Sequence, residues 1–438
     1  MRSSVITAVA CLFSANAAAL SLEQSVAYAI DYSPDIAGQY ARFQSVLRDV
    51  DGAQADYLPQ LNVYAAAGYE DTYYNSGVQI PSDERNMNRT EVGIKASQLL
   101  FDGLKTNANI SRLSFEAESE RLLLLSDAEN VALDVIRVYL NTLKAQTVLE
   151  LSERNVVEHE EIYDDILERT QKGLSSNSDL AQISARVATS KSSMIAATNN
   201  LYDLRTQYTR LVGKTPDNLV KPQFDYQLIP PNKEIAIQQG IDAHPEIQSA
   251  MADIEAAHQE TRREKGNYYP EFNIEAVANR NENVGGLRGP DRDARIMLTM
   301  SYDIFSGGRT IANTEAAAWR SEQARNTRIR AQREVVEGTT LAWHAYELLA
   351  QQKQLLQVNV DAAKAAELGY IEQFNVGRRS LLDVLDAKVE VFLARKNYIE
   401  TDYEHTLAAY RILNAMGRLT YALRVEYPEQ WQTGANNK

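Results

Sequence analysis

The chain of 438 residues carries an internal duplication, which limits its fold more than any single residue does. Short patterns of the first half return in the same order about 200 residues later. The recurring pairs are Ser33-Pro34-Asp35-Ile36 with His244-Pro245-Glu246-Ile247, Tyr57-Leu58-Pro59-Gln60-Leu61-Asn62-Val63 with Tyr268-Tyr269-Pro270-Glu271-Phe272-Asn273-Ile274, Phe101-Asp102-Gly103 with Phe305-Ser306-Gly307, Gly173 and Asp179 with Gly377 and Asp383, and Gly213 with Gly417. The offset is 211 for the early pairs and 204 for the later ones. This period is too long for a solenoid of small repeats, so it predicts two copies of one large unit.

Long helices are predicted by the scarcity of helix-breaking residues. Between about Thr106 and Lys172 the chain has no Pro or Gly, and its apolar residues step by threes and fours, close to a heptad seam. At ~1.5 Å per residue this helix would be roughly 100 Å long. Gly173 and the Ser-rich segment after it predict a reversal of the chain, with a return helix to about Val212. The second copy repeats this pattern around Gly377.

Beyond Pro59 and Pro270 the pattern changes from helical to alternating, which predicts a β-hairpin in each copy. The apolar residues of the four alternating runs are Leu61, Val63, Ala65 and Ala67, then Val92, Ile94 and Ala96, then Phe272, Ile274, Ala276 and Ala278, then Ile296, Leu298, Met300, Tyr302 and Ile304. An apolar side opposite a polar one is typical of a membrane β-strand that faces a wet lumen. A half-buried soluble hairpin would give the same alternation. The seven extra residues of the first copy fall in its hairpin loop, around 73–89.

The N-terminus is expected to be a secretory signal peptide, residues 1–19. Arg2 supplies a charge, residues 5–13 are apolar, and small residues follow. Its removal would change the net charge from −14 to about −15 and would remove Cys11, the only cysteine, which suits an oxidising periplasm. A lipidated Cys11 is the alternative. No later run reaches the ~20 apolar residues of a membrane helix, so a part within a membrane would have to be strands of a closed barrel.

Taken together and in this order, the motifs resemble the TolC family of outer-membrane channel proteins. The resemblance rests on Tyr-x-Pro-x-x-Asn before each first strand, Phe-x-Gly after each second strand, and the segment 374–387 at the second helical turn. It implies a mainly α protein with a small β part: duplicated long antiparallel helical rods forming a periplasmic tunnel, and four strands per chain in a trimeric transmembrane β-barrel. It also implies a homotrimer in outer-membrane lipid, extending into the periplasm of a Gram-negative cell. A periplasmic adaptor (membrane fusion) protein and an inner-membrane ABC or RND transporter would dock at its helical tip.

The expected organisation follows the duplication. Its boundaries are a signal peptide 1–19; a first repeat 20–212 with helices 34–57 and 106–212 and a barrel hairpin 61–101; a linker 213–233; a second repeat 234–417 with helices 245–267 and 310–416 and a barrel hairpin 271–305; and a C-terminal tail 418–438.

The resemblance assigns site residues to the helical turns. Asp383 and Asp386 match aspartates that ring the tunnel entrance, where three chains would supply six carboxylates to attract cations. Arg379 matches a gating arginine, with Asp179 and Ser178 as its expected partners in a latch of the closed tip. On spacing alone, an N-cap acid and a solvated arginine explain the same residues. Phe374 stands where the family has a gating tyrosine, so a hydroxyl bond there would be absent.

The remaining expectations concern docking and cargo. Gly173, Leu174, Gly377 and Arg378 are the predicted tip residues for adaptor docking. Drug-efflux members often have Val before the first turn glycine, whereas this chain has Lys172. The sequence therefore favours a passive exit duct of a tripartite export system for type I protein secretion. Alternatives are the outer-membrane component of a small-molecule or drug efflux pump and, more distantly, a periplasmic coiled-coil scaffold.

No enzyme activity, cofactor, metal site or nucleic-acid partner is expected. No constellation of nucleophile, base and oxyanion donors appears, and the five histidines lack ligand spacing. The acidic balance disfavours nucleic acid. The sequence does not name the exported substrate, the adaptor or the transporter, nor does it give the resting state of the tip.

Overall fold

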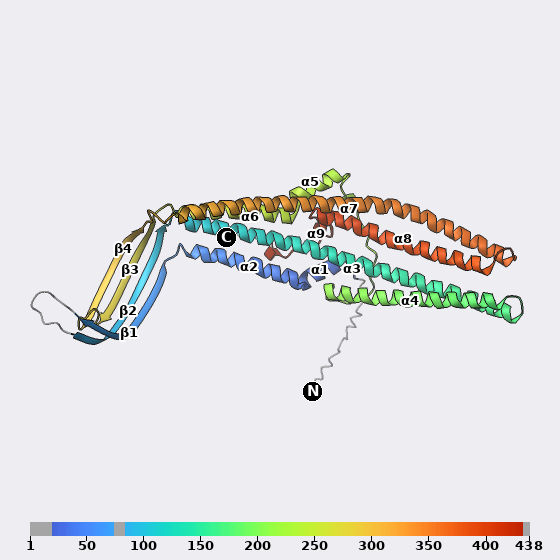
Figure 1. Ribbon diagram of the computed structural model, residues 1–438, viewed down its shortest axis with the longest axis horizontal. Helices are drawn as coiled ribbons and strands as arrows, with labels where there is room; N and C mark the ends of the chain where they lie inside the picture. The colour runs from blue at the N-terminus through green and yellow to red at the C-terminus, as the bar shows by residue number, and fades with distance from the viewer. Residues whose placement is uncertain (1–19, 74–83, 432–438) are drawn as a thin grey trace, which may run out of the picture. The chain divides into compact units, whose positions relative to one another are not determined.

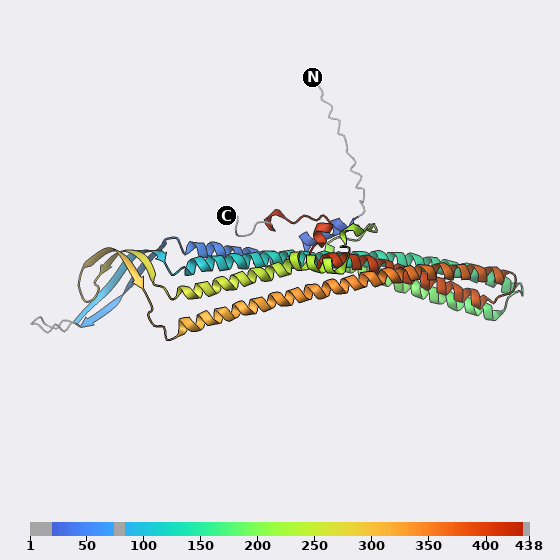
Figure 2. The same cartoon turned by 90° about the horizontal axis from the view of Figure 1, so that it is seen from above.

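The computed structural model describes residues 20–73 and 84–431. The expected signal peptide with Cys11, most of the first hairpin loop and the last seven residues lie outside this part of the chain. In chain order the elements are α1 (Leu22–Tyr32), α2 (Pro34–Ala55), β1 (Gln60–Tyr73), β2 (Glu84–Phe101), α3 (Lys105–Gln171), α4 (Asn177–Val212), η1 (Tyr226–Leu228), α5 (Lys233–Ala243), α6 (Pro245–Gly266), β3 (Glu271–Glu282), β4 (Pro290–Ser301), α7 (Arg309–Asn375), α8 (Leu381–Ala415), α9 (Leu419–Ala422) and η2 (Glu429–Trp431) (Figures 1 and 2).

These elements form two compact units, and each unit contains segments of both repeats. What we call the strand unit consists of Gln39–Leu124, Pro245–Gln332 and the described part of Pro428–Lys438. What we call the turn unit consists of Leu125–His244, Arg333–Tyr427 and the described part of Met1–Gly38. The long helices α3 and α7 contribute residues to both. The compact units therefore cut across the sequence repeats, whose boundaries describe the duplication and not the packing.

The strand unit holds one antiparallel sheet with the order β1-β2-β3-β4. Its register places the predicted apolar residues together, because Leu61 lies opposite Ala96, Ala96 opposite Ala276, and Ala276 opposite Ile296. Since residues opposite each other point to the same side of a sheet, all four alternating runs share one apolar face. The other face carries charged residues, including the ion pair Lys95–Glu275 at 2.9 Å. The predicted alternation is thus confirmed.

Pro270 determines where the β3–β4 ladder ends on the side of the helices. Glu271, the first residue of β3, pairs with Ser301, the last residue of β4. Pro270 precedes it and has no N–H to continue the ladder. For this reason β4 ends at Ser301, and the predicted extension of this strand through Tyr302 and Ile304 is wrong.

The repeated Phe-x-Gly motif is a helix start that also requires close packing. Asp102 Oδ2 accepts hydrogen bonds from Thr106 N at 2.7 Å and Thr106 Oγ1 at 2.8 Å, which caps the beginning of α3. Gly103 has a φ of +70°, and a Cβ atom there would lie 2.3 Å from the carbonyl oxygen of Gly266 at the end of α6. Only glycine satisfies both demands. In the second copy Ser306 bonds Thr310 in the same way.

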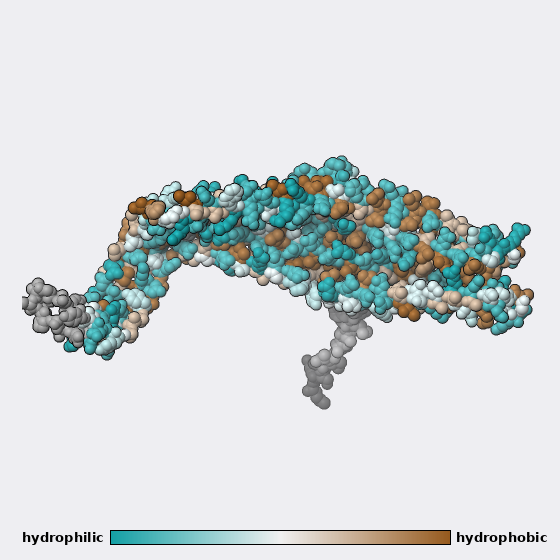
Figure 3. All heavy atoms as spheres, viewed as in Figure 1, coloured by the Kyte–Doolittle hydropathy of each residue, from teal (hydrophilic) through white to brown (hydrophobic). Residues whose placement is uncertain are grey.

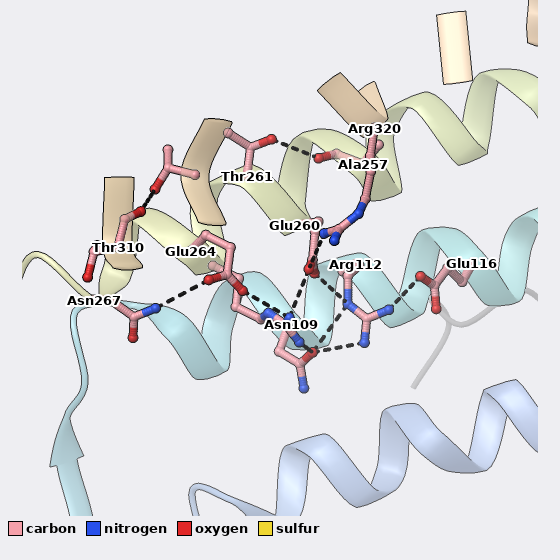
Figure 4. A network of polar contacts seen from close by, with 12 residues as sticks. Asn109, Arg112, Glu116, Ala257, Glu260, Thr261, Glu264, Asn267, Thr310 and Arg320 are labelled. Carbon is pink, nitrogen blue, oxygen red and sulfur yellow. Dashed lines mark hydrogen bonds and ion pairs between the residues drawn. The ribbon is translucent and has the colours of Figure 1, made fainter. Parts of the chain in front are cut away.

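Charged residues join three helices of the strand unit close to the sheet (Figure 4). Glu260 of α6 lies 2.8 Å from Arg263 of the same helix, 3.4 Å from Arg112 of α3 and 3.8 Å from Arg320 of α7. Asn109 accepts hydrogen bonds from Arg112 at 3.0 Å and from Arg263 at 3.5 Å.

Elsewhere in the unit, α2 packs on α3 through a core around Phe43, Val50 and Ala117. None of the described helices has an apolar window long enough to cross a membrane.

The turn unit contains two short helices that the sequence analysis missed, α1 and α5. Ser21 caps α1 in a capping box with Gln24, and Asn232 caps α5 by accepting from Ile235 N at 2.9 Å. The expected helix starts at Pro34 and Pro245 are confirmed, but Ser33 and His244 also end a preceding helix, because their N–H groups bond Ala29 O and Gly240 O.

The tail after Gly417 forms α9, and the buried Glu129 accepts hydrogen bonds from Leu419 N at 2.7 Å and from Thr420 N at 3.0 Å.

Candidate gate at the helical turns

The two helical turns, α3–α4 and α7–α8, have the same backbone. Gly173 and Gly377 both have a φ of 73°, in the left-handed region that ends helices at glycine. Leu174 N bonds Arg169 O at 2.8 Å, and Arg378 N bonds Gln373 O at 2.8 Å, which are equivalent bonds in the two copies. The duplication therefore preserves the path of the chain at each turn. Leu174 is 75% exposed and Val376 is 69% exposed, so apolar side chains lie open at both turns.

Asp179 and Asp383 both occupy the third position of a capping box. Asp179 accepts from Ser176 N at 3.1 Å and from Ser175 Oγ at 3.0 Å. Asp383 accepts from Ser380 N at 3.2 Å and from Ser380 Oγ at 2.7 Å. Hydrogen bonds from Ser176 lower the pKa of Asp179, and those from Ser380 lower the pKa of Asp383, since both stabilise the carboxylate. Both carboxylates therefore start a helix and remain charged at neutral pH.

Arg379 is held within its own turn and does not contact Asp179 in this chain. Its Nε donates to Gln373 Oε1 at 3.0 Å, and its guanidinium lies over the ring of Tyr370, 4.1 Å from the centroid. Its Nη1 is 3.8 Å from Asp383 Oδ1, a long ion pair at the exposed tip. Tyr370, which the sequence analysis did not single out, thus supports Arg379 from one helical turn before Phe374. Ser178 is exposed on the first turn of α4.

Phe374 has a packing role. It lies against a core of Ile166, Ile183, Leu381 and Leu385, which belong to α3, α4 and α8. The side chain therefore joins the two turns through an apolar contact. This agrees with the absence of a hydroxyl at this position, where the resembled family has a tyrosine.

Asp386 is the site residue whose partner the sequence could not show. It forms an ion pair with Arg186, which ties α8 to α4 beside the turns. Two turns along α8 from Leu381, the poorly exposed Lys388 lies 2.9 Å from both Glu158 of α3 and Glu367 of α7. Although burial opposes its charge, the bonds to Glu367 and Glu158 raise the pKa of Lys388. Charged links therefore join the four long helices α3, α4, α7 and α8 behind the tip.

The arrangement is one of ion pairs and caps with no group of acids and histidines that could hold a metal among the described residues. The acidic residues that precede the first turn mostly have cationic partners: Glu160 with Lys191, Asp165 with Arg169 and Glu168 with Lys172. Such a tip can change its contacts by exchanging ion pairs.

Comparison with known proteins decides the family. The sequence pattern of the family described as outer membrane efflux protein matches residues 26–214 and 236–418, one match for each repeat. The chain belongs to this family. The resemblance to TolC channels is thereby confirmed, and so is a place in the outer membrane. The family consists of export channels and is not a family of enzymes.

The chain is similar, at low sequence identity, to several other proteins over much of its length. The outer membrane efflux protein BepC of Brucella suis is 26% identical over 84% of this chain and 79% of its own length. TolC of Escherichia coli is 21% identical over 88% and 80%. The alkaline protease secretion protein AprF of Pseudomonas aeruginosa is 21% identical over 66% and 61%. The CmeC outer membrane channel of Campylobacter jejuni has the same fold, with a TM-score of 0.79 at 15% identity over 91% of this chain and 86% of CmeC.

Proposed function

We propose that this outer membrane efflux protein is the passive exit duct of a tripartite system for type I protein secretion, working as a homotrimer. The sheet carries the argument for the duct. One face is apolar and exposed, as shown by Val63, Ile296 and Leu298 at 66–80% exposure, while the other face is charged. Within the described residues β1 and β4 each have one neighbour, so the sheet has two open edges. Four strands are too few to close a barrel, which requires further copies of the chain.

Surfaces on the helices offer contacts for those copies. Apolar patches interrupt the polar surface along the helices (Figure 3). On α7, Leu341, Leu348 and Leu355 recur every seven residues and are 56%, 63% and 73% exposed. A heptad stripe of exposed leucines is the pattern by which one helix packs on another. It supports association between copies of this chain.

The turns would form the gate of the trimer. Asp383 and Asp386 of three chains would place six carboxylates around the entrance and would attract cations. In the closed state Arg379 would reach Asp179 and Ser178 of a neighbouring helix pair. Its guanidinium has five N–H donors, and the described contacts use its Nε with Gln373 and a long approach to Asp383. An adaptor engaging Gly173, Leu174, Gly377 and Arg378 would break this latch, and an inner-membrane ABC transporter would drive export.

The cargo is the finer part of the proposal. Lys172 at the first turn, where drug-efflux members often have Val, supports protein secretion, and so does the name of the relative AprF. Small-molecule efflux through an RND pump is the second candidate, favoured by the name of BepC, the relative with the higher identity.

Complementation distinguishes the two candidates. The chain would be expressed in a Gram-negative strain lacking its own outer-membrane channel, which carries both a type I secretion system with a measurable protein cargo and an RND pump. Cargo in the medium without restored drug resistance is expected. Restored resistance without secretion would reverse the assignment of cargo. Neither activity, from a chain that is trimeric and in the outer membrane, would show that it needs a different adaptor, and the test would be repeated with an adaptor from the organism that the chain comes from.

A further inference from the structure

Two arginines interrupt the apolar face of the sheet at one level. The register places Arg280 of β3 directly opposite Arg292 of β4, and both side chains are exposed. The same row continues with Val92 and Ala65, which belong to the apolar face. Side chains directly opposite each other have Cβ atoms about 4.5–5.5 Å apart, and like charges in such a pair destabilise the sheet. A bound anion would offset this repulsion.

Within the described chain that anion is not a carboxylate. On the charged face, Arg89 pairs with Glu70 and Glu91, Lys95 with Glu275, and Arg295 with Asp293. The structure shows no ion pair for Arg280 or Arg292 among residues 20–73 and 84–431. Glu282 lies one row further out on the same face and does not pair with either arginine there. The basic residues named on the charged face therefore have carboxylate partners, whereas Arg280 and Arg292 on the apolar face have none among the described residues.

The level of the pair fits the boundary of a membrane. From Phe272 at the helix-side end of β3 to Arg280 the face is apolar over eight residues, or about 26 Å along the strand. With a tilt of ~40° this corresponds to roughly 20 Å along a barrel axis, slightly less than the ~25 Å apolar band of such barrels. Because the hairpin turn follows at residues 283–289, the arginines lie at the edge of the band away from the helices. Lipid headgroups are found at this depth.

Small residues form a hollow in the face immediately inward of the pair. Ala278 and Ala294 lie opposite each other in the next row, followed by Ala276 and Ile296. A hollow of about 580 Å³ is lined by these four residues together with Leu61, Ile94, Ala96, Val277 and Arg295. An acyl chain would fill it against a lining that is aliphatic except for Arg295, which is paired with Asp293.

We propose that Arg280 and Arg292 bind the phosphate of an anionic lipid headgroup, with an acyl chain of the same lipid in the alanine hollow. This inference rests on the proposed membrane duct. Planar guanidinium groups suit phosphate because each can donate two parallel N–H bonds. The bound phosphate would neutralise the arginine pair and would order one lipid per chain at the outer boundary of the sheet.

Native mass spectrometry of the purified trimer, titrated with phosphatidylglycerol or phosphatidylcholine of the same chain length, tests this proposal. The wild type is expected to prefer phosphatidylglycerol. Arg280→Gln with Arg292→Gln should lose about fivefold in affinity per arginine, while the double Lys variant retains most of the preference. Lys95→Gln is the matched control and should bind as the wild type does, because Lys95 lies on the charged face, pairs with Glu275 and does not line the hollow. Ala278→Leu with Ala294→Leu should weaken lipid binding by filling the hollow.

Several outcomes would overturn the assignment. Equal binding of the two lipids by the wild type would exclude a phosphate site. Full competition by inorganic phosphate, with no effect of the leucine variants, would make it a site for free phosphate and not for lipid. Heat-modifiable migration and resistance to alkaline extraction report membrane insertion separately. If the wild type fails these, the proposed duct is wrong; if it passes them but shows no lipid preference, only the lipid site is wrong.

Discussion

The two repeats solve the same structural problem with different chemistry at equivalent positions. Both turns have a glycine with φ of 73° and a Ser–Asp capping box. Where the second turn has Arg379, however, the first has Ser175, and where the second has Asp386, the first has Gln182. Shared residues are those that the backbone requires. Positions where the copies differ are therefore the better candidates for gating, because the fold forms without them.

The largest expected effect concerns a difference at the start of α6, where His244 replaces Ser33 of the first copy. Burial lowers the pKa of His244 to about 4. Since a histidine in the unfolded chain has a pKa near 6.5, the unfolded state binds the additional proton between these values. Stability should thus be complete above pH 6.5 and fall as the pH decreases towards 4, by up to about 3 kcal/mol.

The variant His244→Ser, which copies the first repeat, should remove this contribution. Both residues use their backbone N–H to end the preceding helix, so that bond is retained. Thermal unfolding of both proteins at pH 7 and pH 5 measures the difference, and the other titrating groups cancel between them. Equal losses of Tm in the two proteins would show that His244 does not distinguish the repeats.

The next effect concerns the proposed ring of carboxylates. Asp383→Asn with Asp386→Asn keeps an oxygen for the Ser380 cap while removing six charges from a trimer. Block of the channel current by divalent cations should weaken by roughly tenfold or more, since charged acceptors bind more strongly than neutral ones. Asp165→Asn, which removes a carboxylate paired with Arg169 before the first turn, is the matched control. A similar loss of block in that variant would mean that the second turn has no special part in the entrance.

How far the sequence predicts this molecule depends on the range of the interactions. The long helices, both turns and the two faces of the sheet were predicted, because local periodicity and turn residues determine them. The helices α1 and α5 escape such a prediction because each has only eleven residues, and the Ser-Pro and His-Pro pairs at their ends indicate only the start of the next helix. The partners Arg186 and Lys388 lie 200 and 230 residues from Asp386 and Glu158. No local pattern specifies pairs at such separations.

Arg379 allows the proposed latch to be tested against its counterpart. Arg379→Ala should increase the single-channel conductance of the purified trimer in planar bilayers, by about fivefold if one charge-assisted bond per chain holds the tip closed. Ser175→Ala, at the equivalent position of the first turn, should leave the conductance unchanged. If Arg379→Ala conducts as the wild type does, the contacts with Tyr370 and Gln373 are structural, and the latch is wrong.

The smallest effect tests what the copies share. Ser176→Ala and Ser380→Ala each remove the hydroxyl that caps a helix. Ser176 Oγ accepts a hydrogen bond from Asp179 N at 3.1 Å, and Ser380 Oγ accepts one from Asp383 N at 3.2 Å. Each should reduce the free energy of unfolding by about 1 kcal/mol, and the two losses should add. Ser178→Ala, at an exposed position one residue before Asp179, is the control and should cost little. A much larger loss of unfolding free energy for Ser380→Ala than for Ser176→Ala would mean that the Ser380 bonds also position Asp383 for the gate. The two caps would then share their geometry but not their role.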